Sequence, residues 1–161
     1  MLLSSRIAAI ALAVGLCSST CYAASATEIL NSLSMTDGTI EKIKQINDFV
    51  TNKLAYNSEK VDKGYGSPEA HSDIDALCYN TGTVCAGYCN LFKLLCERYG
   101  IQTENVENDP NQEGDHAWSA NLIDGNWYFT DTTWNDNWDN YFLLLPEGEM
   151  AARHAEAEQI S

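Results

Sequence analysis

Residues 115–136 read DHAWSANLIDGNWYFTDTTWND, and the dipeptide Asp124-Gly125 separates two runs of alternating residues within this stretch. An Asp-Gly pair between alternating runs is a strong signal for a tight β-hairpin. With these two residues at the turn, Ile123 faces Asn126, and the pairing continues outward one residue at a time. The stretch therefore predicts two antiparallel strands whose register is fixed by the turn.

The predicted register places two ionisable side chains on one face of the hairpin. Side chains alternate between the faces of a strand, and residues directly opposite each other share a face. His116 then lies opposite Thr133 and Asp131 lies opposite Trp118, among aromatic side chains on the buried face. Burying either ionisable group without a partner is costly, so we expect each to satisfy the other. A carboxylate that accepts one ring N–H of a histidine leaves the second ring nitrogen as a base.

A thiol at the start of a helix is the third part of this constellation. Residues 84–99 read VCAGYCNLFKLLCERY, which is apolar on most sides and predicts a largely buried helix that stops at Gly100. Cys85 falls in its first turn, where the positive end of the helix and a nearby imidazolium both favour a thiolate. We therefore predict a triad of Cys85 as nucleophile, His116 as base and Asp131 as the residue that orients the base.

Four further segments complete the predicted elements. Apolar residues recur at intervals of three and four residues over 39–56, which predicts an amphipathic helix. Residues 101–106 are expected to form a strand, residues 104–115 an exposed acidic loop, and residues 146–161 a terminal helix to which we assign no chemistry. On that helix, His154 is expected at the surface.

Cysteines Cys78, Cys85, Cys89 and Cys96 remain after the predicted signal sequence. An even number in an exported chain invites disulfides, and a bridge from Cys78 to Cys89 or Cys96 stays open as an alternative. Three of the four lie on one predicted helix, where rigid geometry makes bridges difficult. We expect Cys89 and Cys96 to pack as small apolar side chains.

Residues 1–26 read MLLSSRIAAIALAVGLCSSTCYAASA. One arginine precedes an apolar run that is too short to span a bilayer, and small residues follow, which is the layout of a secretory signal. We expect residues 1–26 to be removed, residues 27–161 to form one domain, and the protein to be exported to the periplasm or the extracellular space.

Acidic residues outnumber basic ones by 23 to 9 in the 161-residue chain, for a formal net charge of −14. This balance argues against nucleic acid and anionic membranes as partners, because both select lysine and arginine. Cationic peptides or amines are compatible with it. We expect no stable membrane insertion once the signal has been removed.

Three blocks resemble the transglutaminase-like superfamily, whose members share a papain-like core. They read GTVCAGYCNLFKLLCERYGI around Cys85, DHAWSANLIDGNWYFTDTTWND around His116 and Asp131, and, more weakly, AHSDIDALCYN upstream. The likeness runs over roughly residues 40–145. It implies the same roles for Cys85, His116 and Asp131 that the residues suggest by themselves, in a small secreted member of bacterial type.

The resemblance implies an α+β fold with a papain/transglutaminase-like core, in which N-terminal helices and a buried central helix pack on a small antiparallel sheet. It implies a cysteine-dependent acyl-transfer enzyme that acts on protein or peptide amides through a thioester. Water would resolve the thioester in a peptidase or amidase, and an amine acceptor in a transglutaminase. We expect no cofactor and no metal. The alternative is a catalytically silent papain-like module that binds cell-wall or protein ligands.

Overall fold

The computed structural model describes residues 28–63, 77, 82–107 and 116–157. The chain divides into two compact units, residues 1–34 and 35–161. In the first, residues 28–31 form a helical turn, and the predicted signal sequence lies outside the described residues. Among the helices that the structure describes, none is both long and apolar enough to cross a membrane.

The second unit is built around a three-stranded antiparallel sheet in the order β1-β2-β3. Helices surround this sheet, and the architecture is the predicted α+β one. The strands are β1 (Thr103–Glu107), β2 (Ala117–Ile123) and β3 (Asn126–Thr130), and the helical elements are α3 (Thr39–Lys53), η2 (Ser58–Lys63), α5 (Cys85–Arg98), α6 (Thr132–Trp138) and α7 (Glu147–Ala157).

The hairpin of β2 and β3 has the predicted register from the turn to the pair Ser119 and Thr130. Its two turn residues, Asp124 and Gly125, have φ values of 49° and 82°. A two-residue hairpin turn of this kind needs positive φ at both positions, which Asp and Gly tolerate better than most residues. The register prediction is therefore confirmed as far as the strands extend.

Beyond Thr130 the prediction fails, because β3 ends there. Asp131 is the N-cap of α6, and its side chain accepts a hydrogen bond from the backbone N–H of Trp134. The chain thus turns into a helix at the position where we expected continued pairing. A carboxylate at an N-cap satisfies a backbone donor that the helix itself leaves without a partner.

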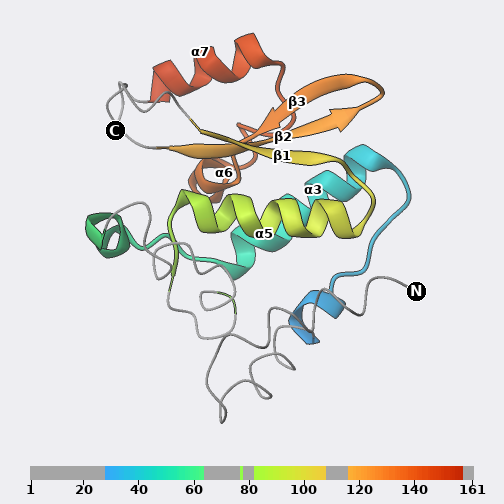
Figure 1. The fold of residues 1–161 in the computed structure, drawn as a ribbon, viewed down its shortest axis with the longest axis horizontal. Coiled ribbons are helices and arrows are strands. Elements are labelled where there is room, and N and C mark those ends of the chain that lie inside the picture. Colours follow the sequence, from blue (N-terminus) through green and yellow to red (C-terminus); the bar gives the residue numbers. More distant parts are fainter. Residues whose placement is uncertain (1–27, 64–76, 78–81, 108–115, 158–161) are drawn as a thin grey trace. The chain divides into compact units, whose positions relative to one another are not determined.

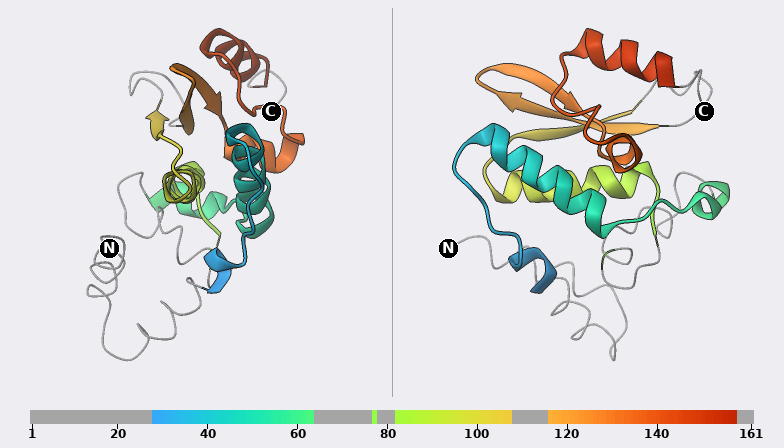
Figure 2. Two further views of the ribbon diagram at one scale, coloured as in Figure 1. Left: turned by 90° about the vertical axis from the view of Figure 1, so that its right-hand side faces the viewer. Right: turned by 180° about the vertical axis from the view of Figure 1, so that it is seen from behind.

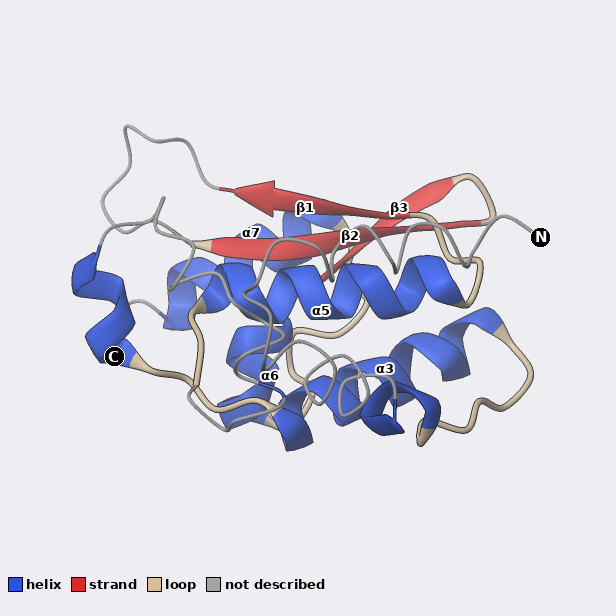
Figure 3. Ribbon diagram, turned by 60° about the horizontal axis from the view of Figure 1, so that its bottom comes forward, coloured by secondary structure: helices blue, strands red, loops and turns tan. Residues whose placement is uncertain are grey.

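Helices cover both faces of the sheet (Figure 1). In two opposite views α7 lies over one face and α5 over the other, with α3 beside α5 (Figures 1 and 2). Figure 3 shows α5 running along the strands and α3 on the side of α5 away from them. The short α6 packs against both α3 and α5.

The hairpin face opposite the one predicted to be buried is also buried, beneath α5. Ser119, Asn121 and Thr130 are all fully buried. Two of the three are satisfied by hydrogen bonds: Asn121 Nδ2 donates to Thr103 Oγ1 at 2.9 Å, and Thr130 Oγ1 donates to Asn121 Oδ1 at 3.3 Å. The hairpin therefore has two covered faces rather than one.

The opposite face of the hairpin packs against α7. Phe129 and Leu145 exchange two backbone hydrogen bonds, of 2.7 and 2.8 Å, so the segment before α7 runs antiparallel to β3. This pairing brings the predicted terminal helix back onto the sheet. A compact apolar cluster results, made of Phe142, Leu145, Met150 and Ala157 with Trp118, Phe129 and Trp134 packed against it.

The prediction of an exposed acidic loop over residues 104–115 is wrong for its first four residues. Residues 104–107 belong to β1, which pairs with β2 over its whole length. Residues 108–115 lie outside the described residues. Pairing with β2 explains why these acidic residues form a strand. The backbone groups of β1 are satisfied by hydrogen bonds to β2, whatever the charge of its solvent-facing side chains.

Candidate active site

Cys85 is the first residue of α5, and the segment before it is held in place by backbone pairing. Thr83 donates its N–H to the carbonyl of Ala55 and accepts the N–H of Asn57, both at 2.9 Å. Gly87 lies directly over Thr83, so close that an added Cβ would fall 2.0 Å from the Thr83 hydroxyl oxygen. The glycine in the VCAGYC stretch thus allows the first turn of α5 to pack on the segment that fixes Cys85.

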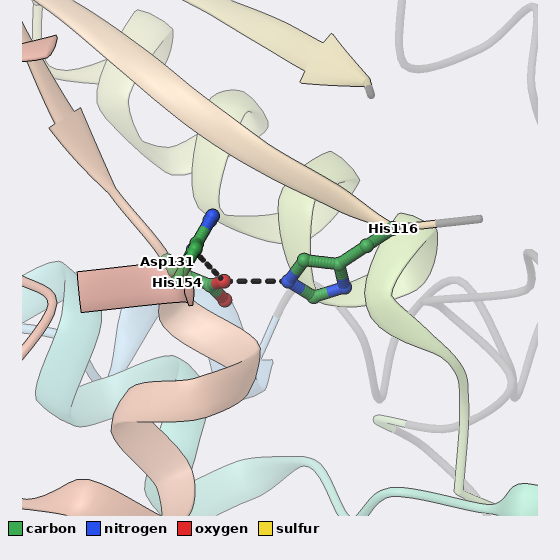
Figure 4. A group of neighbouring side chains, drawn as sticks. All are labelled: His116, Asp131 and His154. Atoms are coloured by element: carbon green, nitrogen blue, oxygen red, sulfur yellow. Dashed lines mark hydrogen bonds and ion pairs between the residues drawn. The ribbon is translucent and has the colours of Figure 1, made fainter. Parts of the chain in front are cut away.

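His116 and Asp131 contact each other directly. Nε2 of His116, just before β2, lies 2.5 Å from Oδ2 of Asp131 at the end of β3 (Figure 4). Asp131 is fully buried and its other oxygen accepts the Trp134 N–H at 3.0 Å. Because Nε2 faces the carboxylate, Nδ1 is the ring nitrogen left for Cys85, whose thiol is near enough to contribute to the raised pKa of His116. The structure therefore brings the three predicted residues together.

Charges in this group favour an ion pair. Burial alone lowers the pKa of His116, but the carboxylate of Asp131, followed by the thiol group of Cys85, outweighs burial and raises that pKa to about 10. Burial likewise raises the pKa of Asp131, yet His116 above all, with smaller contributions from His154 and Trp134, holds it below its ordinary value. A protonated His116 beside an ionised Asp131 is the state that these interactions favour.

A second imidazole reaches the same carboxylate, and the sequence analysis missed it. Nε2 of His154, on α7, lies 2.9 Å from Oδ2 of Asp131, and the His154 side chain is only 12% exposed. The prediction that His154 lies at the surface is wrong, because α7 packs that face onto the sheet. One local signal was available: His154 follows Met150 by four residues and precedes Ala157 by three, the spacing of a buried helical stripe.

Aromatic rings enclose both histidines. The His154 ring centroid lies 4.9 Å from that of Trp118 and 4.6 Å from that of Trp134. The His116 ring stacks on Trp134 at 5.1 Å. Apolar walls of this kind exclude water and so strengthen the electrostatic interactions among the enclosed groups.

His116, Asp131 and His154 could in principle hold a metal ion. Each offers one ligand atom, and these atoms lie within 4.8 Å of one another. Two imidazoles and a carboxylate form a donor set that zinc and similar ions accept. The N–O distances of 2.5 and 2.9 Å, however, are those of direct hydrogen bonds.

The other thiols of α5 are buried and inert. Cys89 and Cys96 are free and at most 1% exposed. Burial raises the pKa of Cys89 strongly and that of Cys96 to about 12, which disfavours a thiolate at either position. Because Cys89 and Cys96 are both free, the structure does not contain the bridge from either of them to Cys78 that the sequence left open; Cys78 itself lies outside the described residues.

Two tyrosines on the Cys85 side of the site were also missed. Burial and the charge of Cys85 raise the pKa of the half-exposed Tyr56, which places that phenol within electrostatic reach of the thiol. The hydroxyl of Tyr88 donates to Asp136 at 2.8 Å. Tyr56 is fixed by its backbone bridge to Thr83, two residues before Cys85.

Comparison with known proteins gives a consistent set of relatives. A family model of the transglutaminase-like superfamily matches residues 26–132. Kyphoscoliosis peptidase of Mus musculus is 26% identical over 106 residues, covering 59% of this chain and 16% of the relative. Kyphoscoliosis peptidase of Homo sapiens is 33% identical over 63 residues, covering 32% of this chain and 10% of the relative. The chain thus spans only a small part of these relatives.

Two solved structures share the fold. A crystal structure of a TGase superposes with a TM-score of 0.56 at 17% identity, covering 76% of this chain and 34% of the other. A Cytophaga hutchinsonii protein described as a candidate cysteine protease gives a TM-score of 0.50 at 18% identity, covering 77% of this chain and 42% of the other.

Proposed function

The chain belongs to the transglutaminase-like superfamily, and from that premise we propose that it is a cysteine-dependent acyl-transfer enzyme acting on protein or peptide amides. The family match, the named relatives and the shared fold support a papain-like cysteine enzyme. The observation that carries the finer proposal is the contact between His116 and Asp131, with the second ring nitrogen of His116 directed to Cys85 at the start of α5.

In the first half of the proposed reaction, the Cys85 thiolate forms an S–C bond with the amide carbonyl carbon. His116 then gives its Nδ1 proton to the leaving nitrogen as the C–N bond breaks, which leaves a thioester on Cys85. In the second half, His116 takes a proton from the incoming acceptor, which attacks the thioester and releases the thiolate. Asp131 keeps the ring in the tautomer and orientation that both halves require.

Water is the acceptor that we favour, because the two curated relatives are named peptidases. Transfer to an amine remains the second outcome to be tested, since it differs only in which nucleophile reaches the thioester. The acidity of the chain, at a formal charge of −14, would attract a cationic peptide or an amine rather than repel it.

We also propose that the enzyme acts after export, with residues 1–26 removed. The support is the order of charge, apolar run and small residues in that stretch. Mass measurement of the protein recovered from an expressing culture tests it: a mature chain that begins near residue 27 in the exported fraction is expected, and a full-length chain inside the cell contradicts export.

A glutamine-containing peptide incubated with purified protein and a labelled amine tests the reaction. Shorter peptides with a new amino terminus indicate hydrolysis of a backbone amide, and ammonia without incorporated label indicates hydrolysis of the glutamine side chain. Incorporated label indicates transamidation. Cys85→Ala should abolish either activity, whereas Cys89→Ala, one turn further along α5, is the matched control and should retain it. Equal activity in Cys85→Ala and the wild type would refute Cys85 as the nucleophile.

Alkylation of Cys85 separates the enzyme from a silent binding module without any substrate. We expect iodoacetamide to react with an apparent thiol pKa below the value of about 8.5 for an ordinary cysteine, and His116→Ala to abolish that advantage. A Cys85 that titrates as an ordinary thiol in both proteins would favour a module that only binds cell-wall or protein ligands.

A further inference from the structure

One oxygen of Asp131 serves two imidazoles. Oδ2 lies 2.5 Å from Nε2 of His116 and 2.9 Å from Nε2 of His154, while Oδ1 accepts the backbone N–H of Trp134 at 3.0 Å. The carboxylate is fully buried, so these three donors replace the water that a carboxylate would otherwise bind. Figure 4 shows His116 and His154 approaching Asp131 from different directions.

We propose that His154 is a positioning residue of the active site, which holds the Asp131 carboxylate in the orientation that presents Oδ2 to His116. The inference rests on the proposed function in one respect: a held carboxylate matters for turnover only if His116 acts as the base. Its structural half, that His154 fixes the contact between Asp131 and His116, stands or falls by itself.

The chemistry of the contact assigns the proton positions. An ionised carboxylate only accepts hydrogen bonds, so both imidazoles must donate from Nε2. For His116 this leaves Nδ1 facing Cys85. The hydrogen bond from His154 also helps to keep the pKa of Asp131 low, as expected for a donor that stabilises the anion.

The His154 side chain is enclosed by its neighbours on α7 and by two tryptophan rings. Its neighbours on the buried stripe of α7, Met150 and Ala157, are 2% and 4% exposed. Its ring packs against Trp118 and Trp134 and is only 12% exposed, so few rotamers other than the observed one are open to it. A side chain fixed in this way can fix its partner, which a mobile surface histidine could not.

His154 lies outside the part of the chain that the family model matches. The family match ends at residue 132, and α7 begins at Glu147. The backbone hydrogen bond from Asp131 to the carbonyl of Phe142, at 2.9 Å, ties the segment that leads to α7 directly to the site. The C-terminal helix thus contributes a residue to a centre whose other members all lie within the family match.

Histidine-labelled protein observed by ¹⁵N NMR tests the structural half without any substrate. We expect two ring N–H protons protected from solvent exchange, one from each imidazole on Asp131. In His154→Ala the His116 signal should exchange and broaden, because the carboxylate is no longer held. In His154→Gln the side-chain amide can still donate, so the His116 signal should persist.

Turnover in the same variants tests the catalytic half. We expect His154→Ala to lower kcat by about tenfold or more with little change in KM, in line with the cost of misplacing a catalytic group. His154→Gln should recover most of that loss. Assays should contain EDTA, so that a metal ion on His116, Asp131 and His154 cannot account for a difference between the variants.

Arg153→Ala is the matched control, because Arg153 is the adjacent residue of α7 and its guanidinium contacts Tyr141 and Glu149 instead of Asp131. It should keep both protected signals and the wild-type kcat, even if its melting temperature falls. A folded His154→Ala protein with an unchanged His116 signal would overturn the positioning role. If instead the His116 signal is lost in His154→Ala, but neither the wild type nor any variant shows turnover and Cys85 alkylation is the same in all of them, the positioning role stands and only the proposed function is contradicted.

Discussion

Two buried polar clusters flank the short helix α6, and they differ in charge. The carboxylate cluster consists of Asp131, His116 and His154 at the start of α6. The amide cluster lies one turn later, where Asn135 Nδ2 donates to Asn47 Oδ1 at 3.0 Å and Asn135 Oδ1 accepts the N–H of Phe142 at 2.8 Å. Asn140 completes the amide cluster by accepting from Asn47 at 2.5 Å.

Both clusters join α6 to segments far away in the sequence. Because the amide cluster does so with neutral side chains, a charged side chain is not needed to hold these segments together. Neutral amides offer donors and acceptors in equal number and can satisfy one another in the core at moderate cost. Burying a carboxylate with two imidazoles is more costly, because the charge loses its hydration. Under the proposed function, the amide cluster supports the fold, whereas the carboxylate cluster serves the chemistry proposed for Cys85.

The largest effect is expected when the carboxylate cluster is made neutral. Asp131→Asn keeps the size of the side chain but removes the charge and allows the wrong tautomer of His116, so kcat should fall by about 10³-fold or more. Steady-state assays of the folded variant measure it, and near-native circular dichroism is the control for folding. Activity within a few fold of wild type would place the orienting group elsewhere.

The reciprocal change should affect stability instead. Asn135→Asp puts a carboxylate into the amide cluster, where Asn47 can donate to it only by turning its amide, and where no cation is at hand among the contacts of Asn135. We expect the free energy of unfolding to fall by about 2–4 kcal/mol. Urea denaturation measures the loss, and kcat of the folded fraction should stay near wild type. A large drop in kcat would show that the two clusters are not functionally separate.

The two clusters should also differ in their response to pH. Because the folded pKa of His116 is raised from 6.5 to about 10, its stabilising contribution is complete below about 6.5 and is lost as the pH rises through about 10. The contribution of Asp131, whose pKa is lowered, is present above about 3.8 and is lost as the pH falls through its folded pKa.

Urea denaturation across this range tests the difference. The gap in stability between wild type and His116→Gln should narrow as the pH rises from about 6.5 past about 10. The gap between wild type and Asn47→Ala should stay constant, because amides do not titrate. Parallel pH profiles for both variants would contradict a charged His116 in the folded protein.

The smallest effect is expected at the edge of the amide cluster. Asn140 is exposed and has a φ of 64°, a conformation that glycine adopts without strain. Asn140→Gly should therefore cost only about 1 kcal/mol for the lost hydrogen bonds, and Asn140→Ala about 1 kcal/mol more for the strained backbone. Thermal unfolding of the two variants measures the difference, and a more stable alanine variant would show that the backbone strain is absent.

Some of the site could be predicted because it depends on short-range rules. Asp124-Gly125 specifies a turn of known geometry, and that turn fixes which residues of β2 and β3 are opposite each other. The apolar run that ends at Gly100 specifies a buried helix with Cys85 at its start. Placing His116 and Asp131 near each other followed from the turn alone, although Asp131 proved to be a helix cap rather than a strand residue.

Other features depended on which surfaces meet in space. The burial of Ser119, Asn121 and Thr130 under α5 could not be predicted from their polarity, because it depends on hydrogen-bond partners supplied by a different strand and helix. The contact of His154 with Asp131 joins residues 23 positions apart through the packing of α7. Periodicity places His154 on a buried stripe, but it does not say what that stripe will cover.

The amino-acid sequence by itself determined the hairpin, the buried helix and the three residues proposed for catalysis, which are Cys85, His116 and Asp131. It could do so because turns, helical periodicity and helix ends depend on neighbouring residues in the chain. Only the tertiary structure decided that α5 and α7 enclose the sheet from both sides and that a second imidazole reaches the carboxylate. Those contacts arise from packing between distant segments, where the free energy depends on the fit of whole surfaces rather than on any local pattern.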